Sequence, residues 1–226
     1  MSYDIILFDA DGTLLDFKKS EQVSFEKTMR AFNLPGSQVL YCDYHSINDS
    51  LWKDFESGLI SKPELFIERF RRYTEKHKFV ADAAELNRYY FGQLGLCGYL
   101  LDGAEEVCRN LAQSKRLYLA TNGETTVQQS RFARSGLSEF FQDIFVSEST
   151  GYPKPHIGYF EYIFDKIKGF DRSRTVIIGD SLSGDITGGN RAGIDTCWYN
   201  PDNLLNETDA KCTYIIRSLD ELYNIL

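Results

Sequence analysis

The sequence predicts an α/β protein: a doubly wound parallel sheet with a helical segment inserted after its first strand. One observation behind this prediction is a series of short, mainly apolar runs of strand length. These runs span Tyr3–Phe8, Arg116–Thr121, Ile144–Ser147, Thr175–Gly179, Thr196–Tyr199 and Thr213–Ile216. The first run ends in acidic residues and a glycine, as a buried strand does where it leaves the core.

Helical segments alternate with the later apolar runs, and this alternation is the second observation. The segments cover Gly103–Ser114, Thr125–Ser135, Ile157–Lys168 and Ser183–Ala192. Gly136 follows the segment that ends at Ser135, and glycine commonly terminates helices. Strands and helices in this order favour parallel strands with helices on both faces of one sheet.

The stretch from about residue 17 to about residue 96 contains no convincing strand, which is the third observation. Apolar side chains recur there at helical spacing, at Phe25, Met29 and Phe32 and again at Phe66, Phe70 and Tyr73. Ser61 and Glu64 form a capping-box pair ahead of the second group. We therefore expect residues 17–96 to form a helical cap, and residues 1–16 and 97–226 to form the α/β core.

Charge is unevenly distributed between these two predicted parts. The chain of 226 residues has a net charge of -8, yet residues 17–96 hold 12 Lys and Arg against 11 Asp and Glu. The acidity therefore belongs to the predicted core. A protein with this balance is not expected to bind nucleic acid or an anionic membrane as its main partner. An anionic small molecule remains possible as a substrate, because a bound metal ion can invert the local field.

The cysteines and the first residues bear on the cellular compartment. The five cysteines are scattered, and no two of them have the CxxC spacing of a zinc or redox site. The first fifteen residues lack the basic and apolar regions of a signal peptide, and no apolar run approaches membrane-spanning length. We expect a soluble cytoplasmic protein with reduced thiols.

The first predicted strand ends in two carboxylates, Asp9 and Asp11, followed by Gly12. Ligands bind at the carboxyl ends of strands in open parallel sheets, so this position is suited to a site. Side chains two residues apart point the same way along a strand, and two neighbouring carboxylates repel. Such a pair favours a bound divalent cation or a shared proton. Alone, it is also consistent with a solvent-exposed strand end.

Three further polar clusters follow later predicted strands. Thr121 and Asn122 precede a glycine at a strand-to-helix turn, where hydroxyl and backbone N–H groups can hold phosphate oxygens. Lys154 lies between two prolines, which restrict its backbone and help to direct its ammonium group. Asp180 ends another strand and suits a metal ligand. Asp185 could lie just outside the metal ligands and orient them, or its negative charge could stabilise the start of a helix.

Taken together, the four clusters are far more specific than any one of them. The motifs are DADGT at residues 9–13, TNG at 121–123, KP at 154–155 and GDSLSGD at 179–185. Their order resembles the phosphatases of the haloacid dehalogenase-like hydrolase superfamily, whose helical C1-type cap lies between the first two motifs. The resemblance covers roughly the whole chain and implies a Rossmann-like core. The TNG loop and residues 193–200, GIDTCWYN, are similar to the pyrimidine 5′-nucleotidase branch.

The resemblance implies a role for each motif residue. Asp9 would be the nucleophile that forms an aspartyl phosphate, and Asp11 would be the general acid and base. A Mg²⁺ cofactor would be held by Asp9, Asp180 and the backbone carbonyl of Asp11. Thr121, the backbone of Asn122 and Lys154 would bind the phosphoryl oxygens. The cap would close over the site and exclude water.

Several activities of the superfamily share these motif residues. We expect a nucleoside monophosphate 5′-phosphatase that prefers pyrimidines, but a sugar-phosphate or phosphoglycolate phosphatase, or a phosphomutase, would share every motif residue. A dehalogenase is disfavoured because family dehalogenases lack the second aspartate, here Asp11. A non-catalytic binding protein on the same scaffold is a further alternative, disfavoured because Asp9 and Lys154 are both retained. The sequence leaves the oligomeric state open.

Other features of the chain allow a functional and a structural interpretation. A basic run of the cap is expected to be a solvated helix face rather than a binding site for anions: Arg69, Arg71, Arg72, Lys76 and Lys78. Four cap aromatics are expected to form its core, although they could stack on a nucleobase: Trp52, Phe55, Phe66 and Phe70. His156 follows the Lys-Pro motif and is assigned no role.

Overall fold

The computed structural model describes residues 3–226 and divides the chain into two compact units. One unit contains the residues up to Asp16 together with Gly98–Leu226, and the other is Phe17–Cys97. The first unit is an α/β domain, and the second is entirely helical. Within the described part of the chain, no helix combines the length and the apolar character that a membrane crossing requires.

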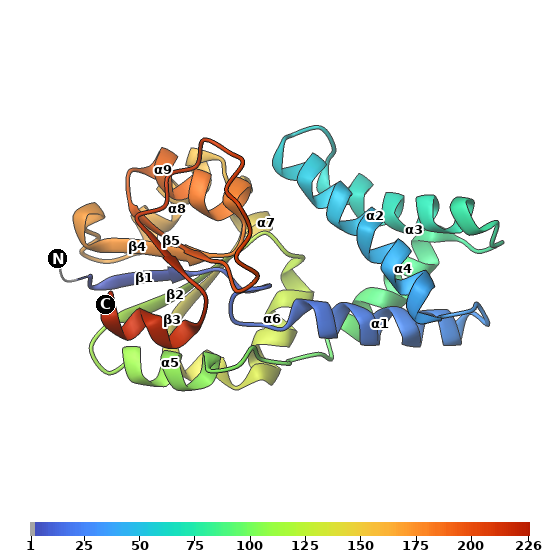
Figure 1. Cartoon of the computed structure of the whole chain (residues 1–226), viewed down its shortest axis with the longest axis horizontal. Coiled ribbons are helices and arrows are strands. Elements are labelled where there is room, and N and C mark those ends of the chain that lie inside the picture. Colours follow the sequence, from blue (N-terminus) through green and yellow to red (C-terminus); the bar gives the residue numbers. More distant parts are fainter. Residues whose placement is uncertain (1–2) are drawn as a thin grey trace. The chain divides into compact units, whose positions relative to one another are not determined.

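The α/β unit is built on a parallel sheet, which Figure 1 shows between two layers of helices. In the described chain the sheet has six strands in the order β3-β2-β1-β4-β5-β6. The strands are β1 (Ile5–Phe8), β2 (Arg116–Thr121), β3 (Phe141–Val146), β4 (Thr175–Gly179), β5 (Asp195–Tyr199) and β6 (Tyr214–Ile216). Every pairing is parallel. The predicted fold class is confirmed.

Alternate residues of each strand point to opposite faces of the sheet, and both faces are buried. Ile6 and Phe8 of β1 belong to one core cluster, which also contains side chains of α5 (Ala104–Leu111) and α6 (Thr125–Ser135). Ile5 and Leu7 belong to a second cluster, with side chains of α8 (Ile157–Lys166) and α9 (Thr187–Ala192). Burial on both faces explains why β1 is a continuous apolar run.

Two predicted elements differ from the structure. The predicted strand Ile144–Ser147 is β3, which begins earlier at Phe141, and its exposed residues Gln142 and Asp143 interrupt the apolar pattern. Such polar residues are common on an edge strand. Ser147 instead begins the short helix α7 (Ser147–Thr150).

The predicted helix Ser183–Ala192 is also different. It begins as a π-helical turn, η3 (Leu182–Ile186), and only then continues as α9. The backbone N–H of Ile186 donates to the carbonyl of Ser181 at 3.1 Å, which is the spacing of a π turn. The other predicted core helices end within a few residues of the observed bounds, as helix ends commonly do.

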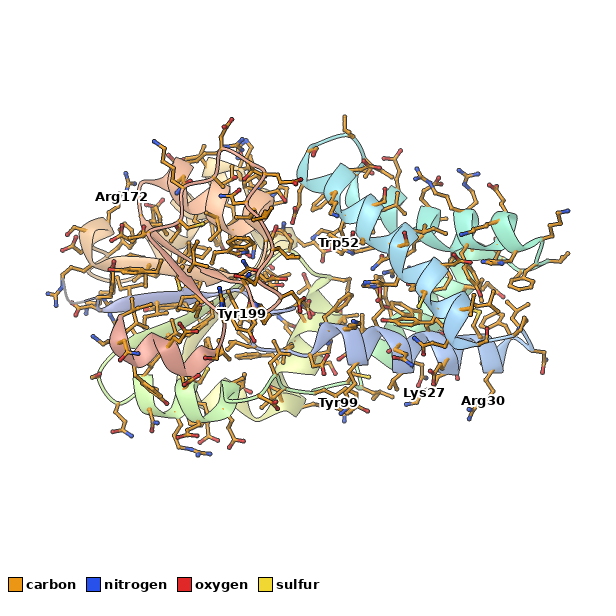
Figure 2. All side chains as sticks on the ribbon, in the orientation of Figure 1. Lys27, Arg30, Trp52, Tyr99, Arg172 and Tyr199 are labelled. Atoms are coloured by element: carbon orange, nitrogen blue, oxygen red, sulfur yellow. The ribbon has the colours of Figure 1, made fainter. Side chains whose placement is uncertain are left out.

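The helical unit consists of α1 (Phe17–Ala31), α2 (Gln38–Glu56), α3 (Lys62–His77) and α4 (Ala83–Leu94). The capping box at the start of α3 is confirmed: the Ser61 N–H donates to Glu64 Oε2 at 3.0 Å, and the Ser61 Oγ accepts from the Glu64 N–H. On α1, Lys27 and Arg30 point away from the helix bundle (Figure 2). These basic residues form the solvent-facing side of α1.

Aromatic side chains form much of the core of the helical unit. Phe25 stacks on Tyr44 with ring centroids 4.9 Å apart. Phe70 is fully buried, and Phe55 and Phe66 are almost fully buried in a cluster against which Trp52 packs. Burial of Phe55, Phe66 and Phe70 favours a role in the core of the cap over stacking on a nucleobase. Trp52 is only partly buried.

A buried polar network joins the four helices, and it corrects one prediction. Arg69 was expected on a solvated face, but it is 1% exposed. Its guanidinium donates to Asn87 Oδ1 at 2.6 Å and to Asn48 Oδ1 at 3.4 Å. Asn48 in turn donates to Glu21 Oε1 at 2.8 Å. Each helix thus contributes one polar residue, and these residues hydrogen-bond one another in place of water. Because the bonds form only in one arrangement, they fix the helices relative to one another.

His45 on α2 provides a test of this network. Its Nδ1 lies 2.6 Å from Glu21 Oε2, and Glu21 is fully buried. The hydrogen bond to Glu21 raises the pKa of His45, although burial opposes it. A raised histidine pKa stabilises the folded state below the unfolded pKa of about 6.5, and this stabilisation is lost as the pH rises through the folded pKa.

We therefore expect His45→Gln to lower the thermal midpoint more at pH 5.5 than at pH 9, relative to the unmodified protein at each pH. Thermal unfolding followed by circular dichroism measures both differences. Lys27→Gln, an exposed charge on α1, is the control and should show no such pH dependence. An equal effect of His45→Gln at the two pH values would contradict a stabilising charge on His45.

Candidate active site

The carboxyl ends of the central strands bring the predicted site residues together. β1 lies between β2 and β4 in the sheet, so the residues that follow these strands meet at one edge. Asp9 follows β1 directly, and its N–H donates to the carbonyl of Ile178 in β4 at 2.8 Å. Thr121 is the last residue of β2, and Asp180 follows β4. The parallel register therefore places Thr121 and Asp180 on either side of Asp9 and one residue further along the strands.

Gly12 allows the chain to turn away from this edge. Its φ of +80° lies in the left-handed region, which side chains disfavour. A Cβ at this position would also lie 2.4 Å from Oδ2 of Asp180, well inside van der Waals contact. Glycine is thus required both by the turn and by the approach of the Asp180 carboxylate.

Lys154 lies at the centre of a buried ion cluster. Its Nζ donates to Asp9 Oδ1, to Asp185 Oδ1 and to the carbonyl of Ala120, each at 2.6 Å. The Asn122 side chain holds the lysine backbone on both sides, because Nδ2 donates to the Lys154 carbonyl at 3.0 Å and Oδ1 accepts from the Lys154 N–H at 2.9 Å. Asn122 therefore positions Lys154 through its amide, a contact that the sequence did not reveal.

Two carboxylates of the buried cluster, together with the exposed Asp180, suit a metal ion. Asp9, Asp180 and Asp185 each offer an oxygen, and these oxygens all lie within 4.8 Å of one another. Carboxylate oxygens are the preferred ligands of hard divalent cations. The three carboxylates outnumber the single ammonium group of Lys154, so a divalent cation would balance the remaining charge. The residues present therefore fit a divalent cation.

The burial of Asp9 and the charges around it change the pKa of its carboxyl group. Burial raises the pKa of Asp9 to about 7, and the charge of Asp185 adds to the effect, whereas Lys154 opposes it. The carboxylate form that a metal ligand or a nucleophile requires is therefore less favourable in the metal-free protein than it is in water. A bound cation would favour that form.

Asp185 is more deeply buried than either sequence interpretation required. It is 1% exposed, and besides Lys154 it accepts the Ser181 N–H at 3.1 Å through Oδ2. Its position within the π turn carries its side chain toward Lys154 and Gly179 of β4 rather than toward solvent. Charge compensation at an exposed helix end does not describe this residue.

Asp11 is not part of the carboxylate group and has separate partners. Its Oδ2 accepts from Gln128 Nε2 at 2.8 Å, and its Oδ1 accepts from the guanidinium of Arg131. Neither α6 residue was predicted for the site. A signal was present, since Gln128 and Arg131 occupy the same buried face of α6 as Val127 and Phe132. Polar residues at apolar positions of a helix indicate a buried polar contact.

Thr121, a predicted phosphate ligand, and His156, which was assigned no role, each have hydrogen-bond partners of their own. Thr121 Oγ1 accepts from Gln128 Nε2 at 2.8 Å and from the Gly123 N–H at 3.3 Å, so its hydroxyl hydrogen is directed elsewhere. His156 has a structural role: its Nδ1 accepts the Gly158 N–H at 3.0 Å at the start of α8. Its ring stacks on Tyr152 with centroids 4.6 Å apart.

Comparison with known proteins agrees with this geometry. Residues 3–193 match the haloacid dehalogenase-like hydrolase family. The chain belongs to this family. It is 42% identical to the HAD-hydrolase YfnB of Bacillus subtilis, over 99% of this chain and 95% of YfnB. The crystal structure of YfnB, which has magnesium bound, superimposes with a TM-score of 0.97 and covers 100% of this chain and 99% of that one.

Two relatives are pyrimidine 5′-nucleotidases. PynA of Streptococcus pneumoniae is 41% identical over 100% of this chain and 96% of its own length. YjjG of Escherichia coli is 29% identical over 100% of this chain and 99% of its own length. The predicted resemblance to the superfamily and to this branch is confirmed, as is the prediction of a hydrolase.

The carboxylate group can be tested by metal binding. We expect Mg²⁺ to raise the thermal midpoint of the protein, because a ligand at a hundredfold excess over its Kd stabilises the folded state by about 2.7 kcal/mol. Asp180→Asn should remove most of this rise, whereas Asp165→Asn, an exposed aspartate on α8, should retain it. Thermal scans with and without Mg²⁺ measure the effect. A full Mg²⁺-dependent rise in Asp180→Asn would exclude Asp180 as a ligand.

Proposed function

We propose that this chain is a Mg²⁺-dependent phosphomonoesterase that acts through an aspartyl-phosphate intermediate. The observation that carries the proposal is the different setting of two neighbouring carboxylates. Asp9 lies within the metal-compatible group and next to Lys154, whereas Asp11 lies outside that group with partners of its own. Two carboxylates in different environments suit two different tasks, a nucleophile and an acid–base group.

Asp9 and Asp180, with the backbone carbonyl of Asp11, would hold the Mg²⁺, and Asp185 lies close enough to contribute. The bound ion supplies charge neutralisation, which allows an anionic carboxylate to approach an anionic phosphate. The presence of magnesium in the YfnB structure supports this assignment.

In the first half of the reaction, Asp9 attacks phosphorus as the bond to the leaving oxygen breaks, and Asp11 donates a proton to that oxygen. In the second half, Asp11 takes a proton from water as the water oxygen bonds to phosphorus and the bond to Asp9 breaks. Lys154, the Thr121 hydroxyl and the backbone of Asn122 stabilise the phosphoryl oxygens. Each of these groups is held at the sheet edge by contacts within the α/β unit.

Dehalogenation is disfavoured because a halide needs no proton when it leaves, so Asp11 would have no task. A phosphomutase would use the same residues but would return the phosphoryl group to a second substrate hydroxyl. Release of inorganic phosphate distinguishes hydrolysis from this transfer.

The mechanism predicts a sharp response to two substitutions. Asp9→Asn should reduce phosphate release by at least about a thousandfold, because an amide is a poor nucleophile and a poor metal ligand. Asp11→Asn should reduce kcat/KM about a hundredfold or more for alkyl phosphates and less for p-nitrophenyl phosphate, whose leaving group needs little protonation. Near-normal turnover by Asp9→Asn would refute the covalent mechanism.

Chelation is a separate test of the metal. EDTA should abolish activity in the unmodified protein.

The substrate we propose is a nucleoside 5′-monophosphate, with a preference for pyrimidines. Support comes from PynA and YjjG, which match over the whole length of this chain. Stacking of a nucleobase on cap aromatics does not support this proposal, because Phe55, Phe66 and Phe70 are buried in the interior of the cap.

A substrate comparison tests this proposal. We expect kcat/KM for UMP and dTMP to exceed that for AMP, glucose 1-phosphate and phosphoglycolate by about tenfold or more, which corresponds to about 1.4 kcal/mol of discrimination. Phosphate release with Mg²⁺ present measures each value. If a sugar phosphate or phosphoglycolate were the best substrate, the nucleotidase proposal would be wrong and the phosphatase proposal would survive.

A further inference from the structure

Two polar side chains of α6 are buried on the face of the helix that packs against the sheet. Gln128 is 2% exposed and Arg131 is 0% exposed, whereas Gln129 and Arg134 on the same helix are exposed. A buried guanidinium is unfavourable unless it is paired and hydrogen-bonded. The burial of Arg131 therefore requires a partner, and its anionic partner is Asp11.

The two side chains hold the carboxylate of Asp11 from one helix. Arg131 Nη1 donates to Asp11 Oδ1 and also to Gln128 Oε1 at 2.9 Å. Gln128 Nε2 donates to Asp11 Oδ2 at 2.8 Å and to Thr121 Oγ1 at 2.8 Å. Each carboxylate oxygen thus has a donor, and the two donors are linked to each other. Two such bonds define both the position and the plane of the carboxylate.

The adjoining turn is shaped to admit Gln128. A Cβ at Gly123 would lie 2.4 Å from Cγ and 2.5 Å from Cδ of Gln128, closer than real contacts allow. A glycine at this position therefore leaves the space through which the Gln128 side chain reaches Asp11. The Asn-Gly turn and the Gln128 contact are parts of one arrangement.

We propose that Gln128 and Arg131 are positioning residues for Asp11 in the phosphatase reaction. The inference rests on the proposed function, in which Asp11 gives a proton to the leaving oxygen and later takes one from water. Asp11 retains 27% side-chain exposure, so without its two donors its carboxylate could rotate away from the reacting atoms. Misplacement of a catalytic group by about 1 Å can cost a hundredfold in rate. Gln128 and Arg131 act through Asp11.

A purely structural role makes a different prediction. If the pair served only to satisfy buried charge, its loss would lower stability or reduce the rate on all substrates alike. If the pair positions an acid–base group, its loss should affect most the substrates that need a proton on the leaving oxygen. The value of kcat/KM reports the steps up to departure of the leaving group, so it isolates this difference.

The experiment compares kcat/KM for UMP, or the best alkyl phosphate if UMP is poor, with kcat/KM for p-nitrophenyl phosphate. Arg131→Met and Gln128→Leu should each lower the alkyl phosphate value by about tenfold or more and the p-nitrophenyl phosphate value by about threefold or less. Arg131→Lys should recover part of the loss. Arg134→Met and Gln129→Leu, matched exposed positions on α6, should match the unmodified protein.

A double-variant series completes the test. In an Asp11→Asn background, Arg131→Met and Gln128→Leu should cause no further loss on the alkyl phosphate, because their effect passes through Asp11. Circular dichroism and the Mg²⁺-dependent thermal midpoint confirm that each variant is folded, and Gln128→Leu decides the outcome if Arg131→Met does not fold.

Equal losses on both substrates, an unchanged or higher alkyl phosphate rate, or full additivity with Asp11→Asn would overturn the positioning role. Each of these results leaves the phosphatase proposal intact, since the unmodified protein is active. Failure of the unmodified protein to release phosphate from either substrate would overturn the proposed function itself, and the positioning role with it.

Discussion

The site depends on one buried interaction, the contact of the Lys154 ammonium with Asp9 and Asp185 at the carboxyl edge of the sheet. Breaking a buried ion pair by removing one partner costs about 3–5 kcal/mol, because the remaining charge is left uncompensated. Lys154 is therefore needed to keep two carboxylates together inside the protein. It also tethers the loop that follows β3 to the strand ends, since the same ammonium binds the Ala120 carbonyl.

Around this contact, the protein separates two kinds of negative charge. Asp9 and Asp185 pair with one ammonium group, and Asp180 lies beside them, so these carboxyl groups outnumber the cations of the protein there, which suits a bound metal ion. Asp11 has a guanidinium of its own, which leaves its carboxylate balanced and oriented. Residues two apart in the sequence thus occupy different electrostatic settings. This separation is what a nucleophile and an acid–base group on one strand end require.

The helical unit shows a comparable use of buried polarity for a structural purpose. Glu21, Asn48, Arg69 and Asn87 come from four different helices and satisfy one another within an otherwise aromatic interior. An apolar interior alone would tolerate several helix registers, whereas a polar network is satisfied in one. The network also explains why the basic run of α3 is not a uniform surface face: Arg69 turns inward, while Arg71 and Arg72 pair with Glu68 near the surface.

The sequence by itself determined the class of sheet, the place of the insert and the identity of the motif residues, because these depend on local patterns. Apolar runs, helical periodicity and a strand that ends in Asp9 and Asp11 can be read within short windows. Only the tertiary structure decided the partners. Gln128 and Arg131 lie more than a hundred residues from Asp11, and α6, β3 and α7 lie between Asn122 and Lys154 in the sequence. Such contacts are set by strand order and helix packing, which periodicity does not encode. The inward turn of Arg69 and the π turn that buries Asp185 have the same cause: each side chain follows a distant partner rather than its local pattern.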